Sequence, residues 1–331
     1  MTDQSTSISR RWLYIPFAIA GVFFFAYYLL WRFGAGEMEK AVDQWVEDQR
    51  AMGIEVSHEA ITRDGFPFFL RLHIDQPMIA APEAGRWRAE RLSIDALPYD
   101  LTRVIFSPTG AQELFVKDYG AWRIDADGIK ASIASDKNRG WVFSVTVGEA
   151  KAQSLSSGAS AAIDSLIFDL APDAAAPTTL ALTLSAGGLE VNAPDTAFHL
   201  AELNTVLNLT RTDLLSGPDP ISQWRDAGGA LVVGGLTAEI EETKFSVSGE
   251  IGLDAADYPA GRLDAEIANP AGLAQWLGAA GALSEEEATS AGAGLTLLTI
   301  ASGGKISAPI DFGNGAAEIA GVKLANLPAA R

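Results

Sequence analysis

The residues that could do chemistry in this sequence are few and scattered. It contains three histidines, His58, His73 and His199, and no cysteine. Cysteine nucleophiles, thiolate metal sites and disulfides are therefore excluded, because each of them needs a cysteine sulfur. The sequence also lacks a Gly-x-Ser-x-Gly nucleophile turn, a phosphate-binding glycine loop and a His-Glu-x-x-His zinc motif. We expect no catalytic residue, no cofactor and no metal ion.

Two acidic patterns have simpler explanations than chemistry. Asp125, Asp127 and Gly128 resemble the start of a calcium loop, but the later ligands of an EF-hand are absent. A β-turn therefore explains this Asp-Gly pair better. The run Glu285–Glu287 follows Ser284, and Ser284 with Glu287 forms a predicted capping box at the start of a helix.

The charge balance argues against one class of binding partner. The chain of 331 residues carries 24 basic and 42 acidic residues, a formal net charge of −18. A nucleic-acid partner is not expected, because phosphate contacts need a basic surface. Hydrophobic residues make up 48% of the chain, which is ordinary for a folded protein and high for a disordered one.

The first structural element that the sequence predicts is a membrane span. We predict the span over residues 12–33. The run from Trp12 to Trp31 within it is 20 residues long and contains no charged residue. At 1.5 Å per residue this run is about 30 Å long, the thickness of the bilayer core. Aromatic residues prefer the two membrane interfaces, and we expect five of them to anchor the helix there: Trp12, Tyr14, Tyr27, Tyr28 and Trp31.

The orientation of this helix follows from what flanks it. Arg10 and Arg11 precede it, whereas Arg32 and Lys40 follow it, so the positive-inside bias is slight. A body of 298 residues follows the only span, and a short-tailed anchor of this kind normally exports its body. We predict a retained single-pass anchor in a bacterial inner membrane, with residues 1–11 cytoplasmic and the body in the periplasm.

An amphipathic helix and a hairpin are predicted after the span. Residues 37–52 place apolar side chains along one stripe, and Gly53 follows as a C-cap. Residues 54–62 and 68–75 alternate between apolar and polar and are separated by a five-residue turn. This turn predicts that Glu59 lies opposite Arg71, as a cross-strand charge pair.

The rest of the chain is a succession of short alternating runs separated by Asp-Gly, Gly-Gly and proline-rich turns, which indicates antiparallel strands. We therefore predict a mainly β (β-rich α+β) protein. After the transmembrane helix comes an elongated, curved antiparallel sheet or half-barrel with a few covering helices. Residues 34–215 form a proximal β-rich region, and residues 216–331 form a distal β-meander with helices near 270–301. A last hairpin turns at Asn314-Gly315.

Several of these features occur in one order that resembles a known family. The set comprises the span, the Trp45 helix, Gly65-Phe66-Pro67 with Phe69-Leu70-Arg71-Leu72, Trp87, Ala96-Leu97-Pro98-Tyr99, Val104-Ile105-Phe106 with Gly110, and the final Pro-Ile-Asp-Phe-x-Asn-Gly hairpin. The chain looks like a member of the alphaproteobacterial domain of unknown function 2125, over nearly its whole length. No activity of that family carries over. Its organisation is also similar to envelope proteins of the AsmA type, and this analogy implies a groove for lipid-like molecules.

Two functions remain open on these grounds. The first is a membrane-anchored envelope protein that binds lipid or another amphiphile on the apolar face of a curved sheet. The expected groove lining is Phe66, Phe68, Leu70, Leu72 and Ile74. The alternative is a non-catalytic structural or interaction module with a filled core, which recruits envelope proteins through its sheet edges. An enzyme is not expected, because no nucleophile, base and orienting group stand together in a motif.

Overall fold

A computed structural model describes residues 11–137, 140–194, 196–217, 219–269, 273–274, 278 and 283–330. It begins with one continuous helix, α1 (Arg11–Ala51). The predicted membrane span and the predicted amphipathic helix are therefore two parts of one element, joined through Gly34–Gly36. The helix continues here because Ala35 is fully buried and each neighbouring glycine leaves room for a side chain of the sheet. Residues 1–10 of the predicted cytoplasmic tail lie outside the described residues.

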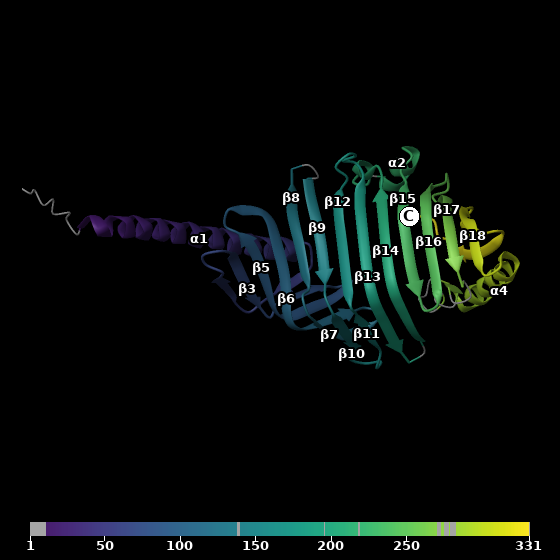
Figure 1. The fold of residues 1–331 in the computed structure, drawn as a ribbon, viewed down its shortest axis with the longest axis horizontal. Helices are drawn as coiled ribbons and strands as arrows, with labels where there is room; N and C mark the ends of the chain where they lie inside the picture. The colour runs from purple at the N-terminus through teal and green to yellow at the C-terminus, as the bar shows by residue number, and fades with distance from the viewer. Residues whose placement is uncertain are drawn as a thin grey trace, which may run out of the picture.

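The rest of the described chain is built mainly from strands, all paired antiparallel in one large sheet, as predicted (Figure 1). The strands are β1 (Glu55–Ser57), β2 (Ile61–Asp64), β3 (Leu70–Asp75), β4 (Met78–Ala81), β5 (Gly85–Leu97), β6 (Asp100–Val116), β7 (Gly120–Ala126), β8 (Lys130–Asp136), β9 (Gly140–Val147), β10 (Ala150–Ser154), β11 (Ser160–Ile163), β12 (Ser165–Pro172), β13 (Leu180–Ala193), β14 (Thr196–Leu209), β15 (Leu231–Ile240), β16 (Thr243–Leu253), β17 (Pro259–Ala268), β18 (Lys305–Gly313), β19 (Ala316–Ile319) and β20 (Val322–Asn326).

The sheet forks and rejoins in its middle. One half of the long strand β6 pairs with β8 and the other half with β7, while β13 pairs with both β12 and β11. The two branches are β8–β9–β12 and β7–β10–β11, and the second lies below the first in Figure 1. Beyond β13 the strands follow one another to β20. The pairing of β14 with β15 joins the predicted proximal and distal regions into one sheet.

Short helices occupy the connections of the distal half. A single turn, η1 (Thr212–Leu214), precedes the short helix α2 (Pro220–Asp226). Helix α4 (Glu285–Ser302) has the predicted capping box between Ser284 and Glu287. The other helix predicted near 270–301 falls mostly outside the described residues. The predicted last hairpin is confirmed, because β18 and β19 pair across the Asn314-Gly315 turn.

The predicted register of the first hairpin is wrong. Arg71 lies opposite Asp64 rather than Glu59, and β1 pairs with β4 instead of continuing into the hairpin. The reason is the position of the connecting loop, Gly65–Phe69. This loop is held by the side of α1, a tertiary contact that the local alternation pattern does not contain.

Most of the buried core lies at the two ends of the sheet, each beneath a helix, and a smaller cluster of Leu200, Ala238 and Ile240 lies on β14 and β15. At the α1 end, Trp31 and Ala35 form a buried cluster with Leu70, and Met38 packs against this cluster and against the one that contains Leu72. At the other end the buried cluster joins α4 to strands β17, β18 and β19. The members of this second cluster are Ala265, Ile267, Ala274, Leu283, Ala291, Leu295, Ile306 and Ile319. Figure 1 shows these two helices at opposite ends of the sheet.

Candidate functional site

One face of the sheet carries a row of apolar side chains that crosses twelve strands. Each residue of this row is the cross-strand partner of the next, so all of them point to the same face. At about 4.8 Å between strands the row is roughly 50 Å long. We call it the apolar row: Leu72, Ile94, Phe106, Ala131, Val145, Phe168, Leu184, Thr205, Leu236, Val247, Ala265 and Ala308.

The opposite face of the same strands is polar. Asp169 accepts a hydrogen bond from Ser144 at 2.5 Å, and the Ser185 hydroxyl donates to the side-chain oxygen of Asn204 at 2.7 Å. These residues alternate with members of the apolar row along their strands, as the period of two requires. The sheet therefore has one solvated face and one face without a charged residue in its central row.

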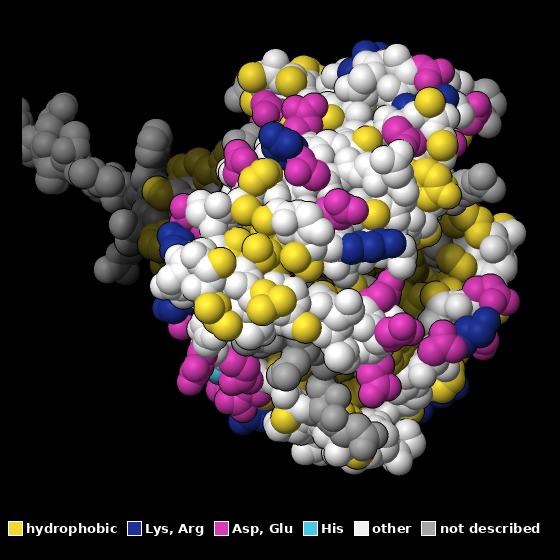
Figure 2. Space-filling view, turned by 90° about the vertical axis from the view of Figure 1, so that its right-hand side faces the viewer, with side chains coloured by type: hydrophobic (Ala, Val, Ile, Leu, Met, Phe, Trp, Pro, Cys, Tyr) yellow, Lys and Arg dark blue, Asp and Glu magenta, His cyan; other side chains and the backbone are white. Residues whose placement is uncertain are grey.

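The helices cover this apolar face at its ends. Leu72 and Ala265, near the two ends of the row, are almost fully buried, at 0% and 2% exposure. In the middle strands Val145, Phe168 and Leu184 are only half-buried. Figure 2, seen from the α4 end, shows hydrophobic side chains recessed between polar surface groups.

A hollow of about 330 Å³ adjoins the row on the side of α1. Its apolar lining includes Val104, Phe106, Ile133 and Trp141, with Leu101 at its margin. Ile133 and Trp141 remain 48% and 42% exposed, although both belong to the apolar face. Large side chains that face inward and stay exposed mark a place where an apolar ligand can be buried.

Thr205 is the one polar member of the apolar row. It is 7% exposed, and its hydroxyl has no hydrogen-bond partner among the described residues. Its cross-strand neighbours are Leu184 and Leu236. A buried hydroxyl without a partner destabilises a protein by about 1–3 kcal/mol. The row therefore contains at its centre one buried hydroxyl that lacks a hydrogen-bond partner among the described residues.

The residues that the sequence put forward as groove lining fall into two groups. Leu70, Leu72 and Ile74 are buried at 2%, 0% and 5% exposure beneath α1. They are core at this end of the sheet, and α1 covers them because its apolar stripe continues past the membrane span. Phe66 packs on the same helix, whereas Phe68 is 73% exposed on the connecting loop.

The aromatic residues that were predicted to anchor the span at the membrane interfaces also fall into two groups. Tyr14 is 65% exposed along the span, and the side chain of Trp12 lies outside the described residues. At the other end of the span, Trp31 is buried and Tyr28 stacks on it at 6.4 Å between ring centroids. Tyr27 donates its hydroxyl hydrogen to a loop carbonyl. These aromatic residues therefore attach the helix to the body. They also lie where the membrane–water interface is expected.

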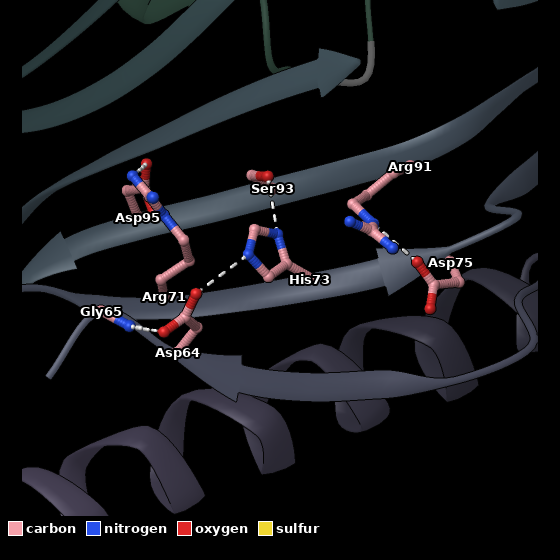
Figure 3. A network of polar contacts seen from close by, with 8 residues as sticks. All are labelled: Asp64, Gly65, Arg71, His73, Asp75, Arg91, Ser93 and Asp95. Atoms are coloured by element: carbon pink, nitrogen blue, oxygen red, sulfur yellow. Dashed lines mark hydrogen bonds and ion pairs between the residues drawn. The ribbon is translucent and has the colours of Figure 1, made fainter. Parts of the chain in front are cut away.

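A polar network occupies the other face of β2, β3 and β5 (Figure 3). Arg71 donates two hydrogen bonds to Asp95, at 2.5 and 2.8 Å, and these bonds raise the pKa of the guanidinium. His73 lies between Ser93, at 2.9 Å, and Asp64, at 3.6 Å. The amide of Gly65 donates to Asp64 at 2.6 Å and, as the largest cause, lowers the pKa of that carboxyl. The network holds the start of the loop to the sheet.

Asp64, His73 and Ser93 are the residue types of a hydrolase triad, but the site lacks the exposed serine and the oxyanion hole of such an enzyme. Ser93 is 8% exposed in the middle of β5, between His73 on one strand and Ser107 on the next. Its strand is paired on both sides, so its backbone amides take part in the sheet and do not form an oxyanion hole. Among the described residues no three His, Asp or Glu side chains group as metal ligands.

The apolar row and the place of Thr205 in it were not predicted from the sequence. The sequence signal of the row was present in each strand as alternation with a period of two, which holds between the bulges. The continuity of the row depends on the register of each strand against its neighbours. Bulges, such as that between Val206 and Leu207, shift this register without a clear local pattern.

Comparison with known proteins identifies the family. Residues 31–328 match the family described as uncharacterized protein conserved in bacteria, DUF2125, and the chain belongs to that family. No curated protein and no solved structure matches the chain significantly. The similarity to AsmA-type envelope proteins stays a prediction.

Proposed function

We propose that this protein is a single-pass membrane protein that binds a lipid or similar amphiphile along the apolar row. The observation that carries the proposal is the continuity of that row across twelve strands, buried beneath helices at its ends and, Thr205 apart, half-buried between them. Burial of an acyl chain there contributes about 0.8 kcal/mol per methylene group removed from water. The unpartnered hydroxyl of Thr205 adds one polar contact.

The anchor is supported by α1, which is long and apolar enough to cross a membrane. Phe17, Val22 and Phe23 are 73%, 69% and 71% exposed along the span. Exposed apolar side chains on every side of a helix fit lipid and not water. The compartment is proposed from the sequence: an inner membrane with a cytoplasmic tail and a periplasmic body.

Neighbouring residues of β12 provide a matched test of lipid binding. Phe168 faces the apolar row, and Ile167, at 49% exposure, faces the opposite side. A benzophenone side chain is placed at either position in the full chain, which is irradiated in its native membrane, extracted and examined by mass spectrometry. We expect lipid adducts at position 168, several-fold more than at position 167.

The result that contradicts the proposal is an absence of adducts at position 168, or equal adducts at both positions. Thr205→Val serves as a second arm, because valine keeps the shape and removes the hydroxyl. We expect this variant to fold and to reduce the crosslinking of lipids whose polar groups reach the row.

The alternative, an interaction module with a filled core, has less support. Its partner strand would pair with a free sheet edge, and the edge strands β1, β2 and β20 have only three, four and five residues. Short edge strands are poor templates for pairing. Absence of lipid at position 168 would favour this alternative.

A further inference from the structure

The loop between β2 and β3 lies against the membrane end of α1. The ring of Phe66 contacts Phe24 and Tyr28, each at 5.3 Å between centroids, and Trp31 at 5.5 Å. Phe24 precedes Trp31 by seven residues, which is about 10 Å along a helix. Trp31 is the last residue of the uncharged run. The loop therefore reaches alongside the last two turns of the proposed span.

Several backbone groups of this loop form hydrogen bonds within the protein. Tyr27 donates its hydroxyl hydrogen to the carbonyl of Pro67, and the Trp31 indole donates to the carbonyl of Phe69 at 2.6 Å. The amide of Phe69 donates to the carbonyl of Gly65 at 2.8 Å. Irregular backbone at membrane depth is tolerated only where its polar groups have partners within the protein. Here the helix itself supplies two of those partners.

The outward side of the loop is apolar and exposed. Phe68 and Phe69 are 73% and 43% exposed. The end of β5 pairs with the start of β3, so the turn that joins β5 to β6 stands beside this loop. That turn and the start of β6 expose Tyr99 at 81% and Leu101 at 62%. Exposed aromatic groups that gather next to a membrane span fit the interfacial region of a bilayer.

We infer that the loop Gly65–Phe69 and the adjoining Tyr99–Leu101 turn form a second membrane contact, in which Phe68 inserts into the lipid leaflet beside α1. The inference rests on the proposed anchor. It fixes the orientation of the body, because two separate contacts prevent rotation about the helix. Leu101 also lines the hollow next to the apolar row. The contact therefore places this hollow of the binding face next to the leaflet.

The absence of cysteine makes the test direct, because each Cys substitution carries a single spin label. Phe68→Cys is compared with Phe23→Cys on the span and with Ile300→Cys on α4, which are 71% and 75% exposed. The labelled full chains are reconstituted in phosphatidylcholine–phosphatidylglycerol nanodiscs. Electron paramagnetic resonance then measures the collision of each label with oxygen, which dissolves in lipid, and with a water-soluble nickel chelate.

We expect the labels at positions 23 and 68 to collide mainly with oxygen, with an oxygen-to-nickel ratio several-fold above that at position 300. A label in Tyr99→Cys should give an intermediate ratio, and it keeps the test intact if Phe68→Cys fails to fold. If position 23 is in lipid while positions 68 and 99 resemble position 300, the loop contact is wrong and the anchor stands. If position 23 also resembles position 300, the anchor is wrong and the loop contact falls with it. Neither result depends on lipid at Phe168, so lipid binding is judged separately.

Discussion

At the scale of single residues, Gly65 shows how a short motif acquires a physical role. Its φ of +92° is a conformation that residues with a side chain rarely adopt. A Cβ there would lie 2.7 Å from the carbonyl oxygen of Phe69, the same oxygen that accepts the hydrogen bond of Trp31. The glycine therefore lets the loop close tightly enough for the helix to hold it.

Substitution of this glycine tests that role. Gly65→Ala should lower the free energy of unfolding by about 3 kcal/mol, because it adds a close contact to an unfavourable φ. Gly128→Ala is the matched control: its φ is +76° with open space around the site, and it should lower the free energy by only about 1 kcal/mol. Chemical unfolding in detergent micelles measures both. Equal losses would show that the contact with Phe69 does not matter.

At the scale of elements, the helices close the two ends of an otherwise continuous sheet. Helix α1 continues from its membrane span onto β3, and α4 packs on β18 and β20. Each helix buries an apolar stripe that the sheet face matches. The start of α4 is fixed by its capping box, in which Glu287 also accepts a hydrogen bond from Asn326 at 2.7 Å. The cap thus joins α4 to β20.

This cap predicts how α4 responds to acid. Hydrogen bonds from Ser284, and then from Asn326, lower the pKa of Glu287 from 4.5 to about 2. Because the folded pKa lies below the ordinary one, the carboxylate stabilises the folded state above pH 4.5, and this stabilisation is lost as the pH falls towards 2. Titration of the Glu287 carboxyl carbon by NMR should give a midpoint near 2. Ser284→Ala should raise this midpoint towards 4.5, and a midpoint near 4.5 in the unaltered protein would contradict the cap.

At the scale of the whole molecule, the chain runs without interruption from the proposed membrane span to the far end of the sheet. The span continues as the helix that forms the first buried cluster, and the strands then follow without a break in pairing. The excess of acidic over basic residues lies in the body, which follows the span. This architecture suits a protein that holds an apolar surface at a defined place relative to a bilayer.

The side of the membrane on which the body lies is a separate prediction. A cysteine in place of Tyr119, which is 74% exposed, should react with a membrane-impermeant maleimide once the outer membrane alone is permeabilised. A cysteine in place of Ser7, in the N-terminal tail, should react only after the inner membrane is opened. Labelling in the opposite order would reverse the orientation, which was predicted mainly from the long body that follows the span.

The sequence by itself determined the elements that depend on local patterns. The uncharged run, the strand alternation, the Ser284–Glu287 cap and the Asn314-Gly315 turn were all predictable, because each is recorded within a few neighbouring residues. Only the tertiary structure decided the register of the first hairpin, the burial of Leu70 and Leu72 beneath α1, and the joining of inward residues into the apolar row. These features depend on contacts between segments far apart in the chain. A pattern of period two specifies the two faces of a strand, but it does not specify which residue of the next strand lies opposite.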